Sequence, residues 1–138
     1  MRFSEHTLRR RAHFYEVDQA GIVHFSCYYR YMEEAEHAFW RAAGITKGAI
    51  GNVGFPRVAA AFDFHAPLRY DDEFDVRMQI ASIGNTSLRY VCRITRDATA
   101  IATGSMTIVC VALGPPMRAV PLPAEMRDRI EVAAAVEA

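Results

Sequence analysis

One amphipathic stretch, Cys27 to Ala42, constrains the fold of this chain more than any other feature. Its apolar residues recur every three to four positions with charged residues between them, which is the pattern of a helix that buries one face. Ser26 is predicted to cap the start of this helix, because its hydroxyl can accept a free amide of the first turn, and Gly44 is predicted to end it. A helix with one apolar face needs a second layer to cover that face.

The rest of the chain predicts strands for this second layer. Alternating apolar and polar residues predict strands within residues 3–15, 55–64, 74–80, 88–94 and 100–113. Gly84-Asn85 and residues 96–98 predict turns between the last three strands. The glycine-rich residues 45–54 predict an irregular connection, and the residues from Pro123 to about Val132 a terminal helix. The sequence therefore predicts one α+β domain, residues 1–138, with a curved antiparallel sheet of about five strands wrapped around one long central helix.

The charges of the chain balance, with 16 Lys and Arg against 16 Asp and Glu. No overall field therefore favours nucleic acid, an anionic membrane or an acidic partner. No stretch is long and apolar enough to span a bilayer, and charges in residues 1–11 stand where a signal peptide has its apolar core. We therefore expect no transmembrane segment and a cytoplasmic location.

Cysteines and histidines give no sign of a metal centre. The three cysteines lie far apart and form no CxxC pair, which argues against a disulfide framework and a structural zinc site. Cys92 and Cys110 are predicted to be buried in strands. A metal site built from Asp18, His24 and His65 would lack the usual ligand spacing, so no metal is predicted.

Asp18 precedes a glycine-containing turn that leads directly to the start of the long helix. The free amides and the positive dipole end of a helix can stabilise a developing oxyanion, and a carboxylate beside them can act as base or nucleophile on the same carbonyl. A carboxylate in such a turn can equally be a solvated cap. The residues alone leave both interpretations open.

Two segments carry a resemblance to a known family. Residues 15–23 (YEVDQAGIV) and 28–33 (YYRYME) closely resemble the signature of the 4-hydroxybenzoyl-CoA thioesterase family of hotdog-fold proteins, which includes the acyl-CoA thioesterases associated with the Tol-Pal system. The resemblance runs nearly from end to end and implies a hotdog fold. It also implies an acyl-CoA thioesterase that hydrolyses an aromatic or a short to medium aliphatic acyl-CoA to free acid and CoA, with no cofactor beyond the CoA of the substrate.

The resemblance assigns catalytic roles near the helix start. It implies that Asp18 is the catalytic carboxylate, attacking the thioester carbonyl or activating water, and that the backbone amide of Phe25 polarises that carbonyl. His24 lies one position before the histidine of the Tol-Pal-associated proteins, so its role is either auxiliary or structural. Glu16 stands where the family motif has its first Asp, and we expect it to be structural or to support the catalytic carboxylate.

Further residues are candidates for binding the substrate. The acyl group is expected near Tyr15, Gly21, Tyr28 and His65, although core packing of the tyrosines and a solvent-facing His65 are the alternatives. The phosphates of CoA need arginines or free amides. The candidates for this site are Asn85, Thr86, Ser87, Arg89, Arg57 and Arg118.

Two other functions remain as alternatives, a hotdog dehydratase or hydratase acting on acyl thioesters and a non-catalytic acyl-thioester-binding dimer. A dehydratase would carry an Asp and a His along its own motif at the helix start, which this sequence lacks. The unpaired edge of a five-stranded sheet predicts at least a homodimer, and the resemblance also allows a homotetramer. The acyl group, and the choice between CoA and an acyl-carrier protein, stay open.

Overall fold

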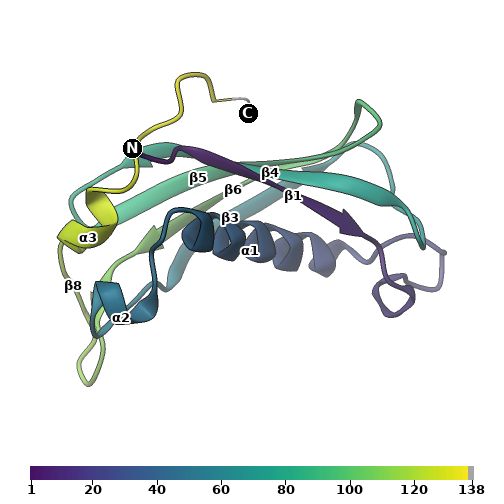
Figure 1. Cartoon of the computed structure of the whole chain (residues 1–138). Helices are drawn as coiled ribbons and strands as arrows, with labels where there is room; N and C mark the ends of the chain where they lie inside the picture. Colours follow the sequence, from purple (N-terminus) through teal and green to yellow (C-terminus); the bar gives the residue numbers. More distant parts are fainter. Residues whose placement is uncertain (137–138) are drawn as a thin grey trace.

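In the computed structural model, which describes residues 1–136, one long helix lies against the concave face of a curved antiparallel sheet (Figure 1). Helix α1 spans Phe25–Ala42. The strands of the sheet are β1 (Glu5–Arg11), β3 (Arg57–Phe64), β4 (Glu73–Ile83), β5 (Ser87–Arg96) and β6 (Thr99–Val109). Their order across the sheet is β1-β4-β5-β6-β3. The predicted α+β architecture of a central helix and about five strands is confirmed.

Strands β4, β5 and β6 form a meander of two hairpins, as predicted. Gly84 and Asn85 lie in the first turn, where the Gly84 amide bonds to the Ser87 carbonyl at 2.8 Å. Asp97 and Ala98 form the second turn and both have positive φ angles. Strand β3 does not pair with β4, its successor along the chain, but crosses to the far edge beside β6.

The core lies between α1 and the concave face of the sheet. Most apolar positions predicted for the helix face are buried, among them Tyr31, Met32, Ala35 and Phe39. Ala42 at the end of the helix is exposed, and the charged Glu36 is buried. Alternate residues of β4 and β5 meet the buried helix face from the sheet, because successive side chains of a strand point to opposite faces. These buried sheet residues include Phe74, Val76, Met78, Ile80, Leu88, Tyr90, Cys92 and Ile94.

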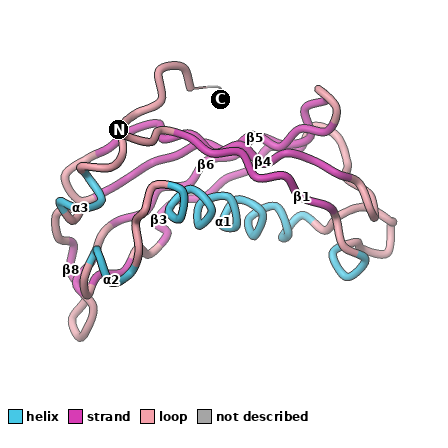
Figure 2. Tube along the Cα trace, viewed as in Figure 1, coloured by secondary structure: helices cyan, strands magenta, loops and turns pink. Residues whose placement is uncertain are grey.

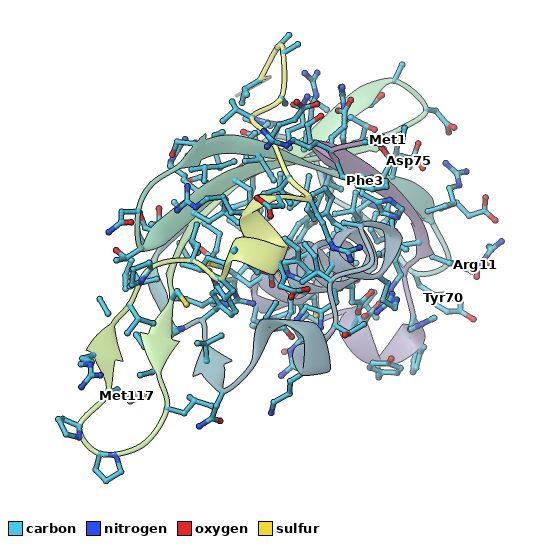
Figure 3. The ribbon with its side chains drawn as sticks, turned by 60° about the vertical axis from the view of Figure 1, so that its left-hand side comes forward. Met1, Phe3, Arg11, Tyr70, Asp75 and Met117 are labelled. Carbon is cyan, nitrogen blue, oxygen red and sulfur yellow. The ribbon has the colours of Figure 1, made fainter. Side chains whose placement is uncertain are left out.

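The remaining elements gather at the two ends of α1. One end carries α2 (Lys47–Ile50), β2 (Val53–Gly54), β7 (Val111–Ala112), β8 (Arg118–Ala119) and α3 (Ala124–Arg127). The other end carries the 3-10 turn η1 (Phe14–Glu16) and the loops beside it (Figure 2). Figure 3 shows Arg11 and Tyr70 on one side of the molecule and Met117, in the β7–β8 connection, on the other.

Three predictions about the first strand, the connection after the helix and the terminal segment were wrong. The first strand ends at Arg11 rather than near Tyr15, because its partner β4 begins at Glu73 and the chain then turns into η1. Residues 45–54 are not wholly irregular, since they contain α2 and β2. The terminal helix stops at Arg127, because the segment after it bonds instead to the N-terminal residue Phe3, whose carbonyl accepts the amide of Glu131 at 3.0 Å.

Two further predictions concern the whole chain. Cys92 and Cys110 are free and buried, as predicted, but only Cys92 is in a strand, since Cys110 lies between β6 and β7. Cys27 is half-buried. Across residues 1–136 no helix is both long and apolar enough to cross a membrane. The single domain predicted for residues 1–138 stays a prediction, and residues 137 and 138 lie outside the described residues.

Candidate active site

Helix α1 begins at Phe25 and is capped by His24, not by Ser26 as predicted. The Nδ1 atom of His24 accepts the backbone amide of Ser26 at 3.3 Å and lies 2.7 Å from its hydroxyl oxygen. An imidazole nitrogen thus supplies the acceptor that a capping hydroxyl would otherwise provide. The amide of Phe25 makes no hydrogen bond to any residue within 1–136, so it remains available at the positive end of the helix dipole.

Asp18 lies at the start of a tight turn in the loop that leads to this helix. Its carbonyl accepts the amide of Gly21 at 2.9 Å, and Gly21 has a φ of +80°, a conformation that favours glycine. One carboxylate oxygen, Oδ1, accepts the amide of Ala20 at 2.8 Å. The second oxygen, Oδ2, has no hydrogen-bond partner among the described residues. The carboxylate therefore stabilises its own turn and keeps one oxygen free to react.

Asp18 and the start of α1 border the same cavity, which has a volume of about 450 Å³. Asp18 is half-buried, whereas His24 and Tyr15 are exposed at the cavity wall, Tyr15 with 81% of its surface accessible. The cavity is also lined by Arg10, Glu16, Val17, Ser26, Cys27, Arg30 and Glu34. The structure thus brings the predicted catalytic carboxylate to one cavity with His24 and Ser26, the two neighbours of Phe25, and Tyr15 is not a core residue.

A buried ion pair lies behind Asp18. The carboxylate of Glu16 accepts both terminal nitrogens of the Arg10 guanidinium at 2.8 Å, the amide of His13 at 2.7 Å and the hydroxyl of Tyr31 at 2.9 Å. Burial by itself raises the pKa of Glu16, but these hydrogen bonds outweigh it and leave the pKa below its ordinary value. Tyr31, whose hydroxyl is both buried and bonded to this carboxylate, has a raised pKa.

Arg10 was not among the predicted site residues. Its guanidinium also bonds to Glu34 at 2.9 Å and lies over the ring of Tyr31, 4.7 Å from the ring centroid. Arg10 falls on the inward side of β1, between Leu8 and Ala12, where an apolar residue is expected. An arginine at such a position indicates a buried acidic partner, and this was the signal that could have identified it.

Two of the predicted substrate-binding residues lie outside this cavity. Tyr28 is buried on the inner face of α1, with its ring 5.0 Å from that of Phe64. His65 is exposed after the end of β3, with Nε2 3.0 Å from the hydroxyl of Thr103. No cluster of three or more His, Cys, Asp or Glu side chains that could hold a metal occurs within residues 1–136.

The six predicted CoA-binding residues do not form one cluster. Asn85 and Thr86 lie at the β4–β5 turn, where their carbonyls accept the amides of Leu122 and Cys110, and Ser87 begins β5. Arg118 is exposed on β8. Arg89 borders a shallow depression with Asp63 and Thr103, on the face of the sheet away from α1, whereas Arg57 points to the helix side.

A second cavity, also of about 450 Å³, lies at the other end of α1. Arg57 and Glu36 form part of its wall, and Arg57 donates to both carboxylate oxygens of Glu36, one of them at 2.9 Å. The wall also carries Trp40, Phe55, Ile50, Val53, Arg41 and Lys47. This cavity thus combines an apolar interior with cationic groups, and sequence reasoning identified only Arg57 of its residues.

Similarity to known proteins shows the family to which this chain belongs. The model of the Thioesterase-like superfamily matches residues 12–130. A provisionally named esterase from Aquifex aeolicus is 34% identical over 96 residues, which cover 68% of this chain and 75% of the relative. The Escherichia coli O157:H7 protein named acyl-CoA thioester hydrolase YbgC is 27% identical over 104 residues, which cover 73% of this chain and 78% of that protein. The solved structure of BH1999 gentisyl-coenzyme A thioesterase is similar to this chain with a TM-score of 0.80 and 28% sequence identity. The match covers 88% of this chain and 99% of that structure's chain. The chain therefore belongs to the Thioesterase-like superfamily, which confirms the predicted thioester hydrolase.

Proposed function

We propose that this thioester hydrolase cleaves an acyl-CoA to a free acid and CoA, with Asp18 as the catalytic carboxylate. The observation that carries the proposal is that Asp18, with one free carboxylate oxygen, borders one cavity with His24 and Ser26, the two neighbours of Phe25. The amide of Phe25 makes no hydrogen bond to any residue within 1–136. A thioester carbonyl bound between Asp18 and this amide would have its oxygen at the helix start and its carbon within reach of the carboxylate. The relatives named for acyl-CoA and gentisyl-CoA hydrolysis support CoA as the leaving group and keep aromatic and aliphatic acyl groups as candidates.

Two routes from this arrangement lead to the same products. As a general base, Asp18 takes a proton from water, the hydroxide adds to the carbonyl carbon, and the C–S bond then breaks as CoA leaves and receives that proton. As a nucleophile, Asp18 forms a mixed anhydride while the CoA thiolate leaves, and water hydrolyses the anhydride to restore the carboxylate. In both routes the Phe25 amide stabilises the oxyanion of the tetrahedral intermediate.

The proposed enzyme is a homodimer formed through β3. This strand is an unpaired edge of the sheet, and its exposed residues include Val58, with 60% of its surface accessible, and Phe64, with 49%. The opposite edge, β1, carries Arg9 and Arg11 paired with acidic residues of β4, and such charges discourage edge pairing. Antiparallel pairing of two β3 strands would leave no apolar edge exposed.

Such a dimer would also bring the two cavities together. Antiparallel pairing sets the Arg57 end of one β3 beside the Phe64 end of the other. The cavity at Trp40 and Phe55 in one protomer would then lie near the start of α1 in its partner, where it could hold the acyl group. A tetramer of two such dimers and a cytoplasmic location remain predictions that go with this proposal.

The test is a thiol-release assay with wild type and Asp18→Asn over a panel of aromatic and aliphatic acyl-CoAs. An Asn side chain keeps an oxygen for the Ala20 amide, so the turn and the fold are expected to persist. We expect kcat to fall at least about a hundredfold, the scale of a lost acid-base or nucleophilic group. Equal rates for the two proteins would rule out Asp18, and binding of acyl-CoA without any turnover by wild type would favour a non-catalytic binder.

Asp71→Asn is the matched control for this test. Asp71 is an exposed carboxylate in the loop before β4, it does not line the cavity, and its positive φ of 70° suits asparagine. We expect its rate to stay within about twofold of wild type, as for most surface substitutions.

A further inference from the structure

Glu16 joins three separate parts of the protein through one buried carboxylate. Only 6% of its surface is accessible, yet both of its oxygens are bonded. The donors come from Arg10 in β1, from the amide of His13 at η1 and from the hydroxyl of Tyr31 in α1. A buried carboxylate with this many donors has one well-defined position, because moving it would leave several polar groups without partners.

The main chain of Glu16 closes the base of the loop that carries Asp18, which we name the Asp18 loop (residues 17–23). The carbonyl of Glu16 accepts the amide of His24 at 2.8 Å. Inside this contact, Val17 and Val23 form an antiparallel bridge and the Asp18 amide donates to the Ile22 carbonyl at 2.8 Å. The Asp18 loop is therefore a small hairpin, with Asp18 near its tip and the first amide of α1 immediately after its base.

Outside this base, the loop is tied to η1 and to the segment before β4. The Val17 amide donates to the Phe14 carbonyl at 3.3 Å. The Val23 amide donates to the Leu68 carbonyl at 2.8 Å, and Ile22 forms an isolated bridge with Arg69. The contacts of Val23 and Ile22 support the strand of the hairpin that leads into α1. The strand that carries Asp18 is supported by Glu16, whose side chain is bonded to β1 and α1.

From this geometry we infer that Glu16 is a positioning residue, which holds the Asp18 carboxylate at the correct place relative to the Phe25 amide. The effect of this positioning on catalysis rests on the proposed function. Glu16 would not touch the reacting atoms itself. Catalysis depends steeply on such placement, since a displacement of about 1 Å can cost roughly a hundredfold in rate.

The first test measures the position of the loop without any reaction. Hydrogen exchange of the backbone amides of residues 17–25 is compared in wild type, Glu16→Gln and Glu36→Gln at equal temperature and pH. Glu36→Gln is the matched control. Glu36 is also a buried carboxylate on α1 that accepts two nitrogens of an arginine, but it lies farther along the helix, away from the Asp18 loop. We expect exchange in 17–25 to rise at least about tenfold in Glu16→Gln and not in Glu36→Gln, because Glu16, unlike Glu36, bonds to this hairpin.

The second test uses kcat and KM for the acyl-CoA that wild type hydrolyses best. Glu16→Gln should lower kcat by about ten- to a hundredfold with KM changed by less than about threefold, because positioning acts on the transition state. Glu16→Asp, which keeps the charge, should recover part of this loss. In the Asp18→Asn background the same Glu16→Gln change should lower the residual rate by less than about twofold, because the group it positions is already gone.

Each outcome decides one part of the inference. Faster exchange in both glutamine variants, or an equal loss of kcat from Glu16→Gln with and without Asp18, would show that Glu16 only stabilises the fold and would overturn the inference. If Glu16→Gln does not fold, Glu16→Asp and Tyr31→Phe, which removes one donor, take its place in both tests with smaller expected effects. If wild type releases no thiol from any acyl-CoA, the proposed function fails, whereas the exchange result still shows whether Glu16 holds the loop.

Discussion

The carbonyl of Glu16 accepts the amide of His24 at 2.8 Å, which joins the residue two positions before Asp18 to the residue that caps α1. Because both ends of the Asp18 loop meet at this contact, the loop cannot move relative to the helix start without breaking it. Asp18 and the two neighbours of Phe25, His24 and Ser26, therefore border one cavity as a consequence of main-chain geometry. The side chain of Glu16 then fixes this unit to β1 and α1.

The ionisation of Glu16 makes the stability of the protein depend on pH. Its pKa in the folded protein lies below the ordinary value of 4.5, so its contribution is fully present above about pH 4.5 and is lost as the pH falls through the folded value. We expect wild type to be more stable than Glu16→Gln by about 2–3 kcal/mol at pH 7. This is small for the loss of a buried ion pair, because Arg10 keeps its second carboxylate partner, Glu34. Urea unfolding of both proteins at pH 7, 5, 4 and 3 measures this difference, which should shrink in the acid range. A difference that stays constant from pH 7 to pH 3 would exclude ionised Glu16 as its source.

His24 should act as a helix cap that asparagine can replace. Its Nδ1 accepts the amide of Ser26, and the side-chain oxygen of asparagine is a favourable acceptor at the same position. We expect His24→Ala to lower the free energy of unfolding by about 1 kcal/mol, whereas His24→Asn should retain most of it. Urea denaturation at pH 7 measures both values. Equal losses for the two variants would mean that the imidazole contributes through something other than the cap.

Local periodicity was enough to predict the main elements of the fold. The spacing of apolar residues from Cys27 to Ala42 identifies the face of α1 that is buried, and Gly84-Asn85 identifies the first hairpin turn. Both signals depend on residues that are close in sequence. The position of Asp18 before the helix start is local in the same sense, but the residues alone left open whether Asp18 is catalytic or a solvated cap, and only the family resemblance assigned it a role.

Features that depend on distant partners could not be predicted. Alternation in the first strand continues beyond Arg11, but pairing stops there because β4 begins at Glu73. Ile130 pairs with Phe3 at the opposite end of the chain, which ends the predicted terminal helix early. Nothing in the local sequence says which acidic residue an arginine will meet, so the partners of Arg57 and Arg10 were missed.

The three thiols should differ sharply in reactivity. Cys92 is buried on β5, and its burial raises the pKa of the thiol to about 12, while Cys110 is also fully buried with a raised pKa. Cys27 is half-buried at the wall of the Asp18 cavity, and its pKa is raised by burial and by Glu16. Because the thiolate is the reactive form, we expect Ellman's reagent at pH 8 to modify at most Cys27 in the native protein and all three after denaturation. Rapid modification of two or more thiols in the native protein would contradict the buried positions.

The unprotected edge of β3 gives the last prediction, which concerns association. Ala60 is exposed near the middle of β3, so a lysine there would place like charges from two protomers close together in an antiparallel pair. We expect wild type to have twice the mass of one chain by light scattering after size exclusion, and Ala60→Lys to have the mass of one chain. Thr7→Lys is the matched control, because Thr7 is exposed at the middle of β1, the opposite edge, whose neighbours Arg9 and Arg11 are already charged. If Thr7→Lys dissociates the protein and Ala60→Lys does not, association uses the β1 edge.

Because the proposed acyl site combines cavities from two protomers, Ala60→Lys should lose thioester hydrolysis together with the dimer. A fully active monomer would show that the Asp18 cavity is sufficient alone.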